Sequence, residues 1–166
     1  MLLIAFGANL PGKGGCSPLD TCLRALGKLQ DLPDMAFIAV SRWYRSKPFP
    51  RDDRQPDYCN GVARFEGTPD PAGLLATLHR IETEFGRTRT VANAARTLDL
   101  DLIDMNGMVR FEPSPVLPHP RAHLRAFVLR PILDIAPDWV HPAMQVRGAT
   151  LMASLPQSTS MPMVSW

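Results

Sequence analysis

The spacing of apolar residues along the chain predicts four strands. Apolar and aromatic residues gather in residues 2–6, 36–44 and 58–66, and leucines alternate with aspartates in residues 98–102. The first run stops at Gly7 and is too short for a signal peptide, and no run approaches the roughly 20 residues of a membrane span. We therefore expect a globular chain that does not enter a membrane.

Apolar residues at helical spacing predict two helices between these strands. The first helix begins with Ser17 as its N-cap and ends before Pro33. The second begins after Asp70 and ends at Gly86, because glycine favours the residue that follows a helix.

The order strand–helix–strand–strand–helix–strand, followed by a third helix, fits an α+β domain of the ferredoxin-like, split-βαβ plan with helices packed on the sheet. The third helix covers residues 126–136, and we expect it to break or restart at Pro131. Residues 1–154 are expected to form the domain, and residues 155–166 a flexible tail. This plan hosts many functions, so it does not identify one.

Composition narrows the choice of partners and compartment. The 166 residues suit one domain, and 18 Lys+Arg against 16 Asp+Glu leave a net charge of +2, which argues against a general polyanion-coating surface. The three cysteines are an odd number without a C-x-x-C motif, which favours a reducing, cytoplasmic location. We expect a monomer with small-molecule partners, and no nucleic-acid or membrane partner.

Two aspartates carry the strongest chemical signal. Asp99 and Asp101 alternate with leucines, so they share one face of a strand, roughly 6.5–7 Å apart. Two carboxylates so placed repel each other unless a cation lies beside them, and Mg²⁺ is the natural partner because it takes one or two carboxylates together with substrate phosphates. Taken alone, the pair is explained better by the solvated acidic face of a half-buried strand.

Arginines near this pair favour phosphate chemistry. Guanidinium groups make forked contacts to phosphate oxygens, and phosphoryl transfer needs charge neutralisation and alignment above all. Several lie on a polar loop over residues 87–96, and others follow the last strand. The arginines concerned are Arg87, Arg89, Arg96, Arg121 and Arg125.

Two further patterns bear on a ligand. Tyr58 and Asn60 share a strand face, and an aromatic plane beside an amide suits a flat heterocycle, although an ordinary strand surface explains the pair as well. His119 and His123 do not form a helical zinc pair, because Pro120 places His119 outside a helix. The chain has no Walker loop and no G-x-G-x-x-G turn.

These residues lie in ordered motifs that resemble the 6-hydroxymethyl-7,8-dihydropterin pyrophosphokinase family from residue 3 to about residue 142. The motifs are IAFGANL at 4–10, SRWYRS at 41–46, QPDYCN at 55–60, RIE at 80–82 with GR at 86–87, RTLDLD at 96–101, PH at 118–119 and RAFVL at 125–129. The resemblance implies a folate-pathway enzyme that moves the β,γ-diphosphate of ATP to the hydroxymethyl group of the pterin and releases AMP.

The resemblance also implies the roles of individual residues. Asp99 and Asp101 match the pair that holds two Mg²⁺ ions, and Arg87 and Arg96 match catalytic arginines on the phosphates. Residues that match nucleotide contacts are His79, Glu82, Arg89, His119 and Arg125. Residues that match the pterin pocket are Ser46, Pro48, Phe49, Tyr58, Asn60 and Phe127.

The chain departs from the family on the loop that closes over the nucleotide. Many members end this loop with Trp-Gly-Pro-Arg, whereas residues 93–96 read Asn-Ala-Ala-Arg, and Pro120 follows His119 where some members have tyrosine. Two alternatives remain. An inactive pterin- or nucleotide-binding homologue is disfavoured by the presence of the aspartates and arginines, and a ferredoxin-like nucleic-acid-binding module is disfavoured by only 7% aromatic residues.

Overall fold

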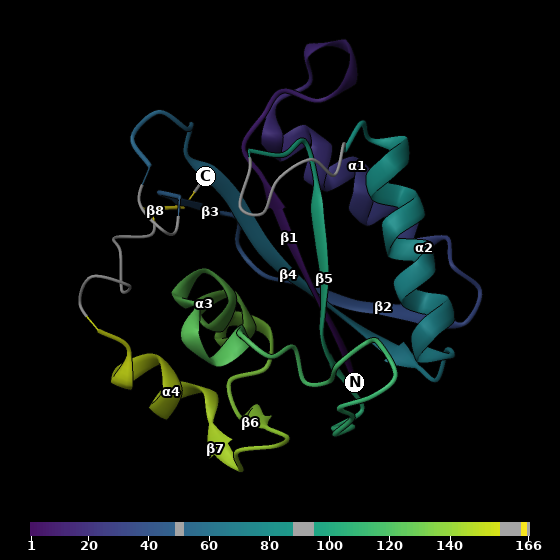
Figure 1. The fold of residues 1–166 in the computed structure, drawn as a ribbon, viewed down its shortest axis with the longest axis vertical. Helices are drawn as coiled ribbons and strands as arrows, with labels where there is room; N and C mark the ends of the chain where they lie inside the picture. Colours follow the sequence, from purple (N-terminus) through teal and green to yellow (C-terminus); the bar gives the residue numbers. More distant parts are fainter. Residues whose placement is uncertain (49–51, 88–94, 157–163, 166) are drawn as a thin grey trace.

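The computed structural model of the chain describes residues 1–48, 52–87, 95–156 and 164–165. In this part, six strands form one antiparallel sheet in the order β5-β1-β4-β3-β8, with β2 also paired to β4 (Figure 1). The strands are β1 (Leu2–Ala8), β2 (Met35–Val40), β3 (Tyr44–Ser46), β4 (Tyr58–Gly67), β5 (Asp99–Met105) and β8 (Val164–Ser165). A separate pair consists of β6 (Val140–His141) and β7 (Val146–Arg147).

Helices cover both faces of the sheet (Figure 1). The helices are α1 (Pro18–Gln30), α2 (Pro71–Glu84), α3 (Ala126–Ile135) and α4 (Gly148–Ser154), with short 3₁₀ turns η1 (Lys13–Gly15) and η2 (Ala122–Leu124). The first face lies under α1 and α2, and the second under α3 with α4 beside it. The chain is therefore an α+β protein with an antiparallel sheet between two helical layers.

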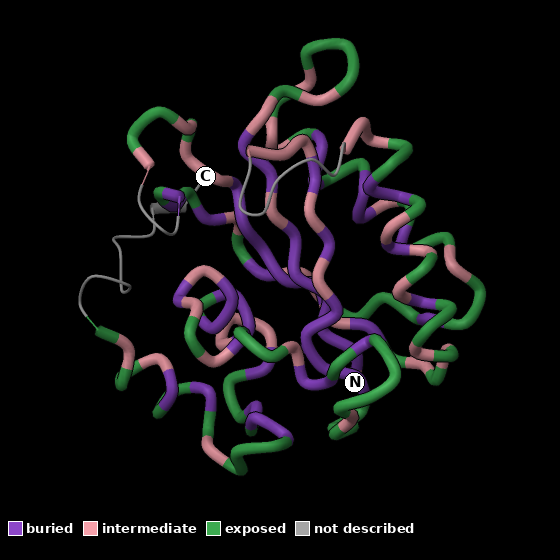
Figure 2. The backbone as a smooth tube through the Cα atoms, in the orientation of Figure 1, coloured by how far each residue is buried: buried purple, intermediate pink, exposed green. Residues whose placement is uncertain are grey.

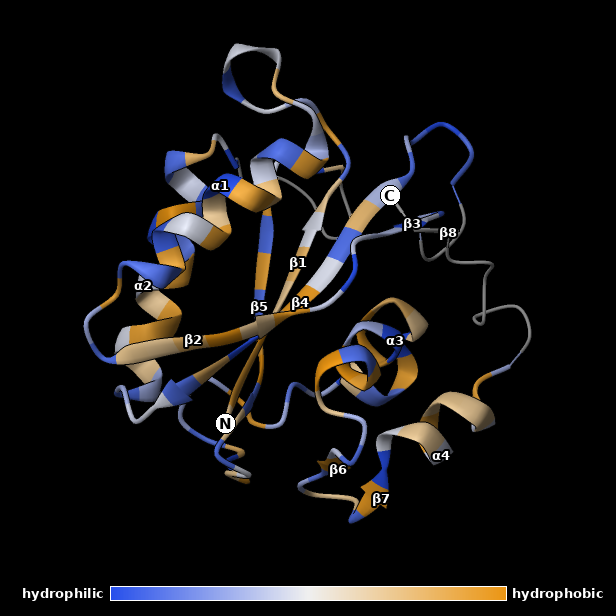
Figure 3. Ribbon diagram, turned by 180° about the vertical axis from the view of Figure 1, so that it is seen from behind, coloured by the Kyte–Doolittle hydropathy of each residue, from blue (hydrophilic) through white to orange (hydrophobic). Residues whose placement is uncertain are grey.

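The alternation of strand β1 explains the two layers. Leu2, Ile4 and Phe6 pack in the core with α1 and α2, whereas Leu3 and Ala5 pack in the core with α3. A strand that is buried on both faces must be apolar throughout, which the N-terminal run is. The burial view shows this central strand and its neighbours enclosed between the helical layers (Figure 2), and α3 is predominantly hydrophobic (Figure 3).

The predicted helix boundaries are confirmed by their caps. The Ser17 hydroxyl accepts a hydrogen bond from the Asp20 backbone N–H (3.1 Å), and the Asp70 carboxylate accepts one from the Gly73 N–H (2.7 Å). These bonds satisfy donors that have no partner inside the helix. Gly86 ends the second helix with φ +88°, in the left-handed region that glycine tolerates best.

Two expectations are corrected. The predicted strand over residues 36–44 is divided, since β2 ends at Val40 and β3 begins at Tyr44. Between them the Ser41 hydroxyl accepts a hydrogen bond from the Val62 N–H (3.0 Å). The helix α3 runs without a break through Pro131, since buried residues on both sides hold it against the sheet. Of the predicted tail, residues 157–163 and 166 lie outside the described residues, and residues 164–165 form β8, which pairs with β3.

The apolar contacts between α3 and the sheet stop short of one end of the sheet face that carries this helix. Its core partners on the strands are Leu3, Ala5, Val62 and Ile103, whereas the strand residues beyond them are polar or glycine. Among the described residues, no helix is both long and apolar enough to cross a membrane.

Candidate active site

The uncovered end of the sheet presents polar side chains from three adjacent strands. Gly7 on β1 lies opposite Asn60 of β4 and Asp99 of β5, and Asp101 follows two residues later on β5. Residues in register across an antiparallel sheet point to the same face, as do residues two apart along a strand. The predicted shared face of Asp99 and Asp101 is therefore confirmed, and it is the face that carries α3.

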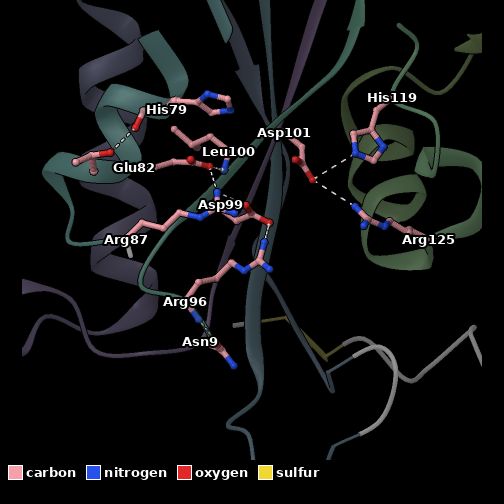
Figure 4. A network of polar contacts seen from close by, with 11 residues as sticks. Asn9, His79, Glu82, Arg87, Arg96, Asp99, Leu100, Asp101, His119 and Arg125 are labelled. Carbon is pink, nitrogen blue, oxygen red and sulfur yellow. Dashed lines mark hydrogen bonds and ion pairs between the residues drawn. The ribbon is translucent and has the colours of Figure 1, made fainter. Parts of the chain in front are cut away.

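Each aspartate on this face contacts positively charged side chains. Asp99 accepts from Arg87 and Arg96, each with a nitrogen–oxygen distance of 2.5 Å. Asp101 lies 3.3 Å from an Arg125 nitrogen and 3.8 Å from His119 Nε2 (Figure 4). The repulsion expected between the two carboxylates is thus relieved by arginines from two sides of the site.

Glu82 joins the helix α2 to the outer edge of β5. Its side chain is 1% exposed, accepts a hydrogen bond from the Leu100 backbone N–H (2.8 Å) and forms an ion pair with Arg87 (Figure 4). A buried carboxylate needs such partners, because an unpaired charge in the interior is strongly unfavourable. Arg87 therefore bridges Glu82 and Asp99 and is held between the helix and the strand.

The opposite side of the site comes from the segment before α3. The His119 backbone N–H donates to the Ile103 carbonyl (2.8 Å), which fixes this segment against β5. Burial lowers the pKa of His119, and the nearby Asp101 carboxylate offsets only part of this shift. The imidazole therefore stays neutral further into the acid range. Burial also lowers the pKa of Arg125, although arginine remains charged at any physiological pH.

A cavity of about 550 Å³ lies between these two sides. Its lining includes β5 as the floor, α2 as one wall and residues 114–121 as the other. The predicted site residues in its lining are His79, Glu82, Arg87, Arg96, Asp99, Asp101, His119 and Arg125. The fold thus gathers the predicted metal, catalytic and nucleotide residues, with one exception. Arg89 lies outside the described residues.

The predicted pterin residues lie on the neighbouring strands. Asn60 and Ser46 are both buried, and the Asn60 amide donates to the Ser46 hydroxyl (2.8 Å). A Cβ placed on Gly7 would lie 3.6 Å from Asn60 Oδ1 and 4.0 Å from a Tyr58 ring carbon, so these groups border one patch. Burial raises the pKa of the Tyr58 hydroxyl.

The remaining predicted pterin residues are Phe127, Pro48 and Phe49. Phe127 lies at the start of α3, where the Arg125 guanidinium stands 5.5 Å from its ring centre, and Pro48 is buried just after β3. None of the described pterin candidates lines the 550 Å³ cavity. Phe49 lies outside the described residues.

Several residues that build the site were not predicted from the sequence. Asn9 is 1% exposed, and its side chain accepts a hydrogen bond from the Arg96 backbone N–H (2.8 Å). Its only sequence signal was its place in the first motif. Leu75 and Val116 line the cavity as apolar groups, and no local pattern in the sequence separates such residues from ordinary surface or core positions.

Comparisons with known proteins agree with this geometry. The family model of 7,8-dihydro-6-hydroxymethylpterin-pyrophosphokinase matches residues 3–137. A Synechocystis protein named 2-amino-4-hydroxy-6-hydroxymethyldihydropteridine pyrophosphokinase is 43% identical over 137 residues, which are 82% of this chain and 69% of that protein. Proteins of the same name from Haemophilus influenzae and Pseudomonas aeruginosa are 37% and 38% identical, over 86% and 81% of this chain and 86% and 80% of their own. The resemblance seen in the motifs is confirmed, and the chain belongs to the 7,8-dihydro-6-hydroxymethylpterin-pyrophosphokinase family.

Proposed function

We propose that the protein transfers diphosphate from ATP to the hydroxymethyl group of 6-hydroxymethyl-7,8-dihydropterin, giving AMP and the pterin diphosphate, as a step of folate biosynthesis. The observation that carries this proposal is the pair Asp99 and Asp101 at the floor of an arginine-lined cavity, in a chain of this family. The same observation disfavours an inactive homologue, because the groups that transfer chemistry needs are present.

The cavity suits a nucleotide in both size and lining. Leu75, Leu102 and Val116 offer apolar surface for a base, while the arginines around β5 offer forked donors for phosphate oxygens. His79, Glu82, Arg89, His119 and Arg125 are proposed as the nucleotide-binding residues. The triphosphate would then lie between α2 and the start of α3.

The proposed cofactor is Mg²⁺, with two ions bound at the site. Asp99 and Asp101 present carboxylate oxygens toward the cavity with side chains 22% and 31% exposed, which fits a hard cation shared with phosphate oxygens. No group of three or more His, Cys, Asp or Glu suited to a metal ion occurs among the described residues, so the remaining ligands would come from ATP and water. Bound there, the ions would neutralise phosphate charge in the transition state.

The residues of the chain supply alignment and charge in the proposed reaction. The pterin, held by Ser46, Pro48, Phe49, Tyr58, Asn60 and Phe127, would present its hydroxyl oxygen to the β-phosphorus. That oxygen attacks in line, the bond from the β-phosphorus to the α-phosphate oxygen breaks, and AMP leaves. Arg87 and Arg96 spread the charge that develops on the transferred group.

We also propose the ferredoxin-like plan, a monomeric state and a cytoplasmic location for the protein. The support for the plan is the order β5-β1-β4, with β2, the strand after the first helix, paired to β4 on the side away from β1. The two helical connections, through α1 and α2, cover the same face. The layer of α3 and α4 on the other face is an addition to this plan.

The product of the reaction tests the proposal. The protein is mixed with ATP, Mg²⁺ and the hydroxymethyl-dihydropterin, and nucleotides are separated by chromatography. We expect AMP and pterin diphosphate in equal amounts, and no AMP when the pterin is left out. ADP as the product would contradict diphosphate transfer, and binding of both ligands without any product would favour the inactive homologue.

A further inference from the structure

One arginine of the cavity has no partner of opposite charge among the described residues. The arginines in the lining are Arg87, Arg96, Arg121 and Arg125, and the carboxylates are Glu82, Asp99 and Asp101. The three carboxylates pair with Arg87, Arg96 and Arg125. Within the described part of the chain, the Arg121 guanidinium forms no hydrogen bond or ion pair, and its side chain is exposed. Arg121 is therefore the excess positive charge of the cavity.

The backbone of Arg121 is fixed, although its side chain is not. The Arg121 N–H donates to His119 Nδ1 (3.2 Å), and its carbonyl accepts from the Leu124 N–H (3.2 Å) in the turn η2. This places its Cα between His119 and Arg125, which both face Asp101. Its charge contributes, after burial, to the lowered pKa of both neighbours, so the three groups lie within electrostatic range of one another.

We propose that Arg121 is a further nucleotide-binding residue, whose guanidinium receives the polyphosphate of ATP at the rim of the cavity. The inference rests on the proposed function, because it assumes that the cavity takes ATP. The paired arginines must exchange a carboxylate for a phosphate when the nucleotide arrives, whereas Arg121 gives up no ion pair. Its contribution is therefore expected in affinity and association, and only weakly in the chemical step.

The charge balance explains why such a residue is useful. Among the described lining residues three carboxylates offset three arginines, so Arg121 supplies the positive charge that remains for a highly anionic ligand. An exposed cation at the entrance raises the local concentration of anions, and its effect is screened by salt. Both consequences can be measured without any assumption about the reacting atoms.

The test compares Arg121→Ala and Arg121→Lys with Arg130→Ala. Arg130 is exposed on α3 and does not line the cavity, so its removal changes the net charge equally. Calorimetry measures binding of a non-hydrolysable ATP analogue at low and high salt, and steady-state assays give kcat and KM. For Arg121→Ala we expect about tenfold weaker binding, which corresponds to about 1.4 kcal/mol, with kcat within about twofold of the wild type.

The variants separate the possible outcomes. Arg121→Lys is expected to recover part of the affinity, since charge without the forked geometry is retained, and Arg130→Ala to bind like the wild type. The dependence of affinity on salt is expected to weaken only in Arg121→Ala. Binding of Arg121→Ala equal to that of Arg130→Ala, or a parallel loss of pterin affinity, would overturn the assignment. Weakened nucleotide binding in a protein that makes no AMP would support Arg121 and refute the proposed reaction.

Discussion

Asn9 and Arg96 are joined by two reciprocal hydrogen bonds across 87 residues of sequence. The Arg96 backbone N–H donates to Asn9 Oδ1 (2.8 Å), and the Asn9 N–H donates to the Arg96 carbonyl (3.1 Å). The Asn9 amide also donates to the Pro56 carbonyl (3.3 Å). One buried amide thus joins the loop after β1, the segment before β4 and the arginine that contacts Asp99.

Replacement of Asn9 by alanine is expected to loosen Arg96. Loss of the acceptor removes the side-chain partner of the Arg96 N–H in a partly buried place, which lowers the free energy of unfolding by about 1–3 kcal/mol. Denaturant titration measures this change, and calorimetry with an ATP analogue should show weaker binding. The control is Asn106→Ala, at the other end of β5. Unchanged nucleotide affinity in Asn9→Ala would show that Arg96 does not depend on this contact.

Replacement of Asp99 by asparagine is expected to abolish most activity. The variant removes the negative charge of a proposed metal ligand that also pairs with Arg87 and Arg96. A loss of several kcal/mol of transition-state stabilisation corresponds to about 10²–10⁴ in rate. AMP formation measures the rate, with Asp138→Asn as the control outside the cavity. Pterin binding should persist. Turnover near that of the wild type at ordinary Mg²⁺ concentration would remove Asp99 from the proposed site.

Replacement of Asn60 by alanine is expected to affect one substrate only. Its amide lies on the patch around Gly7 and does not line the cavity proposed for ATP. Pterin binding should weaken by about 1–3 kcal/mol, because a desolvated polar edge of the ligand loses its partner. Calorimetric titrations with each ligand check this separation. An equal loss of affinity for both ligands would mean that Asn60 supports the sheet and does not read the pterin.

Replacement of Glu82 by glutamine tests the contact between α2 and β5. An amide oxygen can still accept the Leu100 N–H, but the charge that pairs with Arg87 is lost. Because Arg87 keeps Asp99, we expect unfolding free energy to fall by about 1–3 kcal/mol. Glu84→Gln, on the same helix, removes exposed ion pairs to Lys28 and Arg80 and should change stability by less than about 1 kcal/mol. Equal effects in the two variants would contradict the importance of burial here.

Asp134 on α3 is expected to make stability depend on pH in the acid range. Burial raises its pKa, but hydrogen bonds from Arg42 and Tyr44 outweigh burial and leave the pKa below its ordinary value. A carboxyl group with a lowered folded-state pKa stabilises the protein above its unfolded pKa of about 3.9, and this stabilisation is lost as pH falls through the folded value.

The Asp134 prediction is checked by chemical denaturation at several pH values. Wild type should exceed Asp134→Asn in stability above about pH 4, and the difference should shrink below that pH. Tyr44→Phe removes one of the hydrogen bonds to Asp134. It should therefore reduce only in part the stability difference between the carboxylate and the Asp134→Asn variant. A difference that does not change with pH would show that the carboxylate charge plays no role.

The sequence was most informative where a local rule applies. The caps at Ser17 and Asp70 and the shared face of Asp99 and Asp101 follow from hydrogen-bonding chemistry and strand period, so they could be predicted within a few residues. The separation of β2 from β3 depends on a Ser41 hydroxyl that bonds to β4, which no period along the chain reveals.

Long-range contacts account for the rest of the differences. Pro131 would break an isolated helix, but packing against the sheet holds α3 together on both sides of it. The sequence predicts Mg²⁺ beside the two aspartates, and the structure in addition sets arginines beside them, from segments before and after β5. Arg96 is only three residues from Asp99, whereas the pairing of Arg125 with Asp101 is set by the fold and cannot be predicted from local spacing.

Gly7 has no side chain, so a single added methyl group at this residue would enter the centre of the site. A Cβ there would lie 3.6 Å from Asn60 Oδ1 and 3.7 Å from Asp99 Cβ, between the group proposed for the pterin and the group proposed for the phosphates. Neither neighbour would have to move, since both distances are ordinary contacts. We therefore expect Gly7→Ala to leave the binding of each substrate alone unchanged. It would hinder only the simultaneous binding of the two substrates on either side of β1.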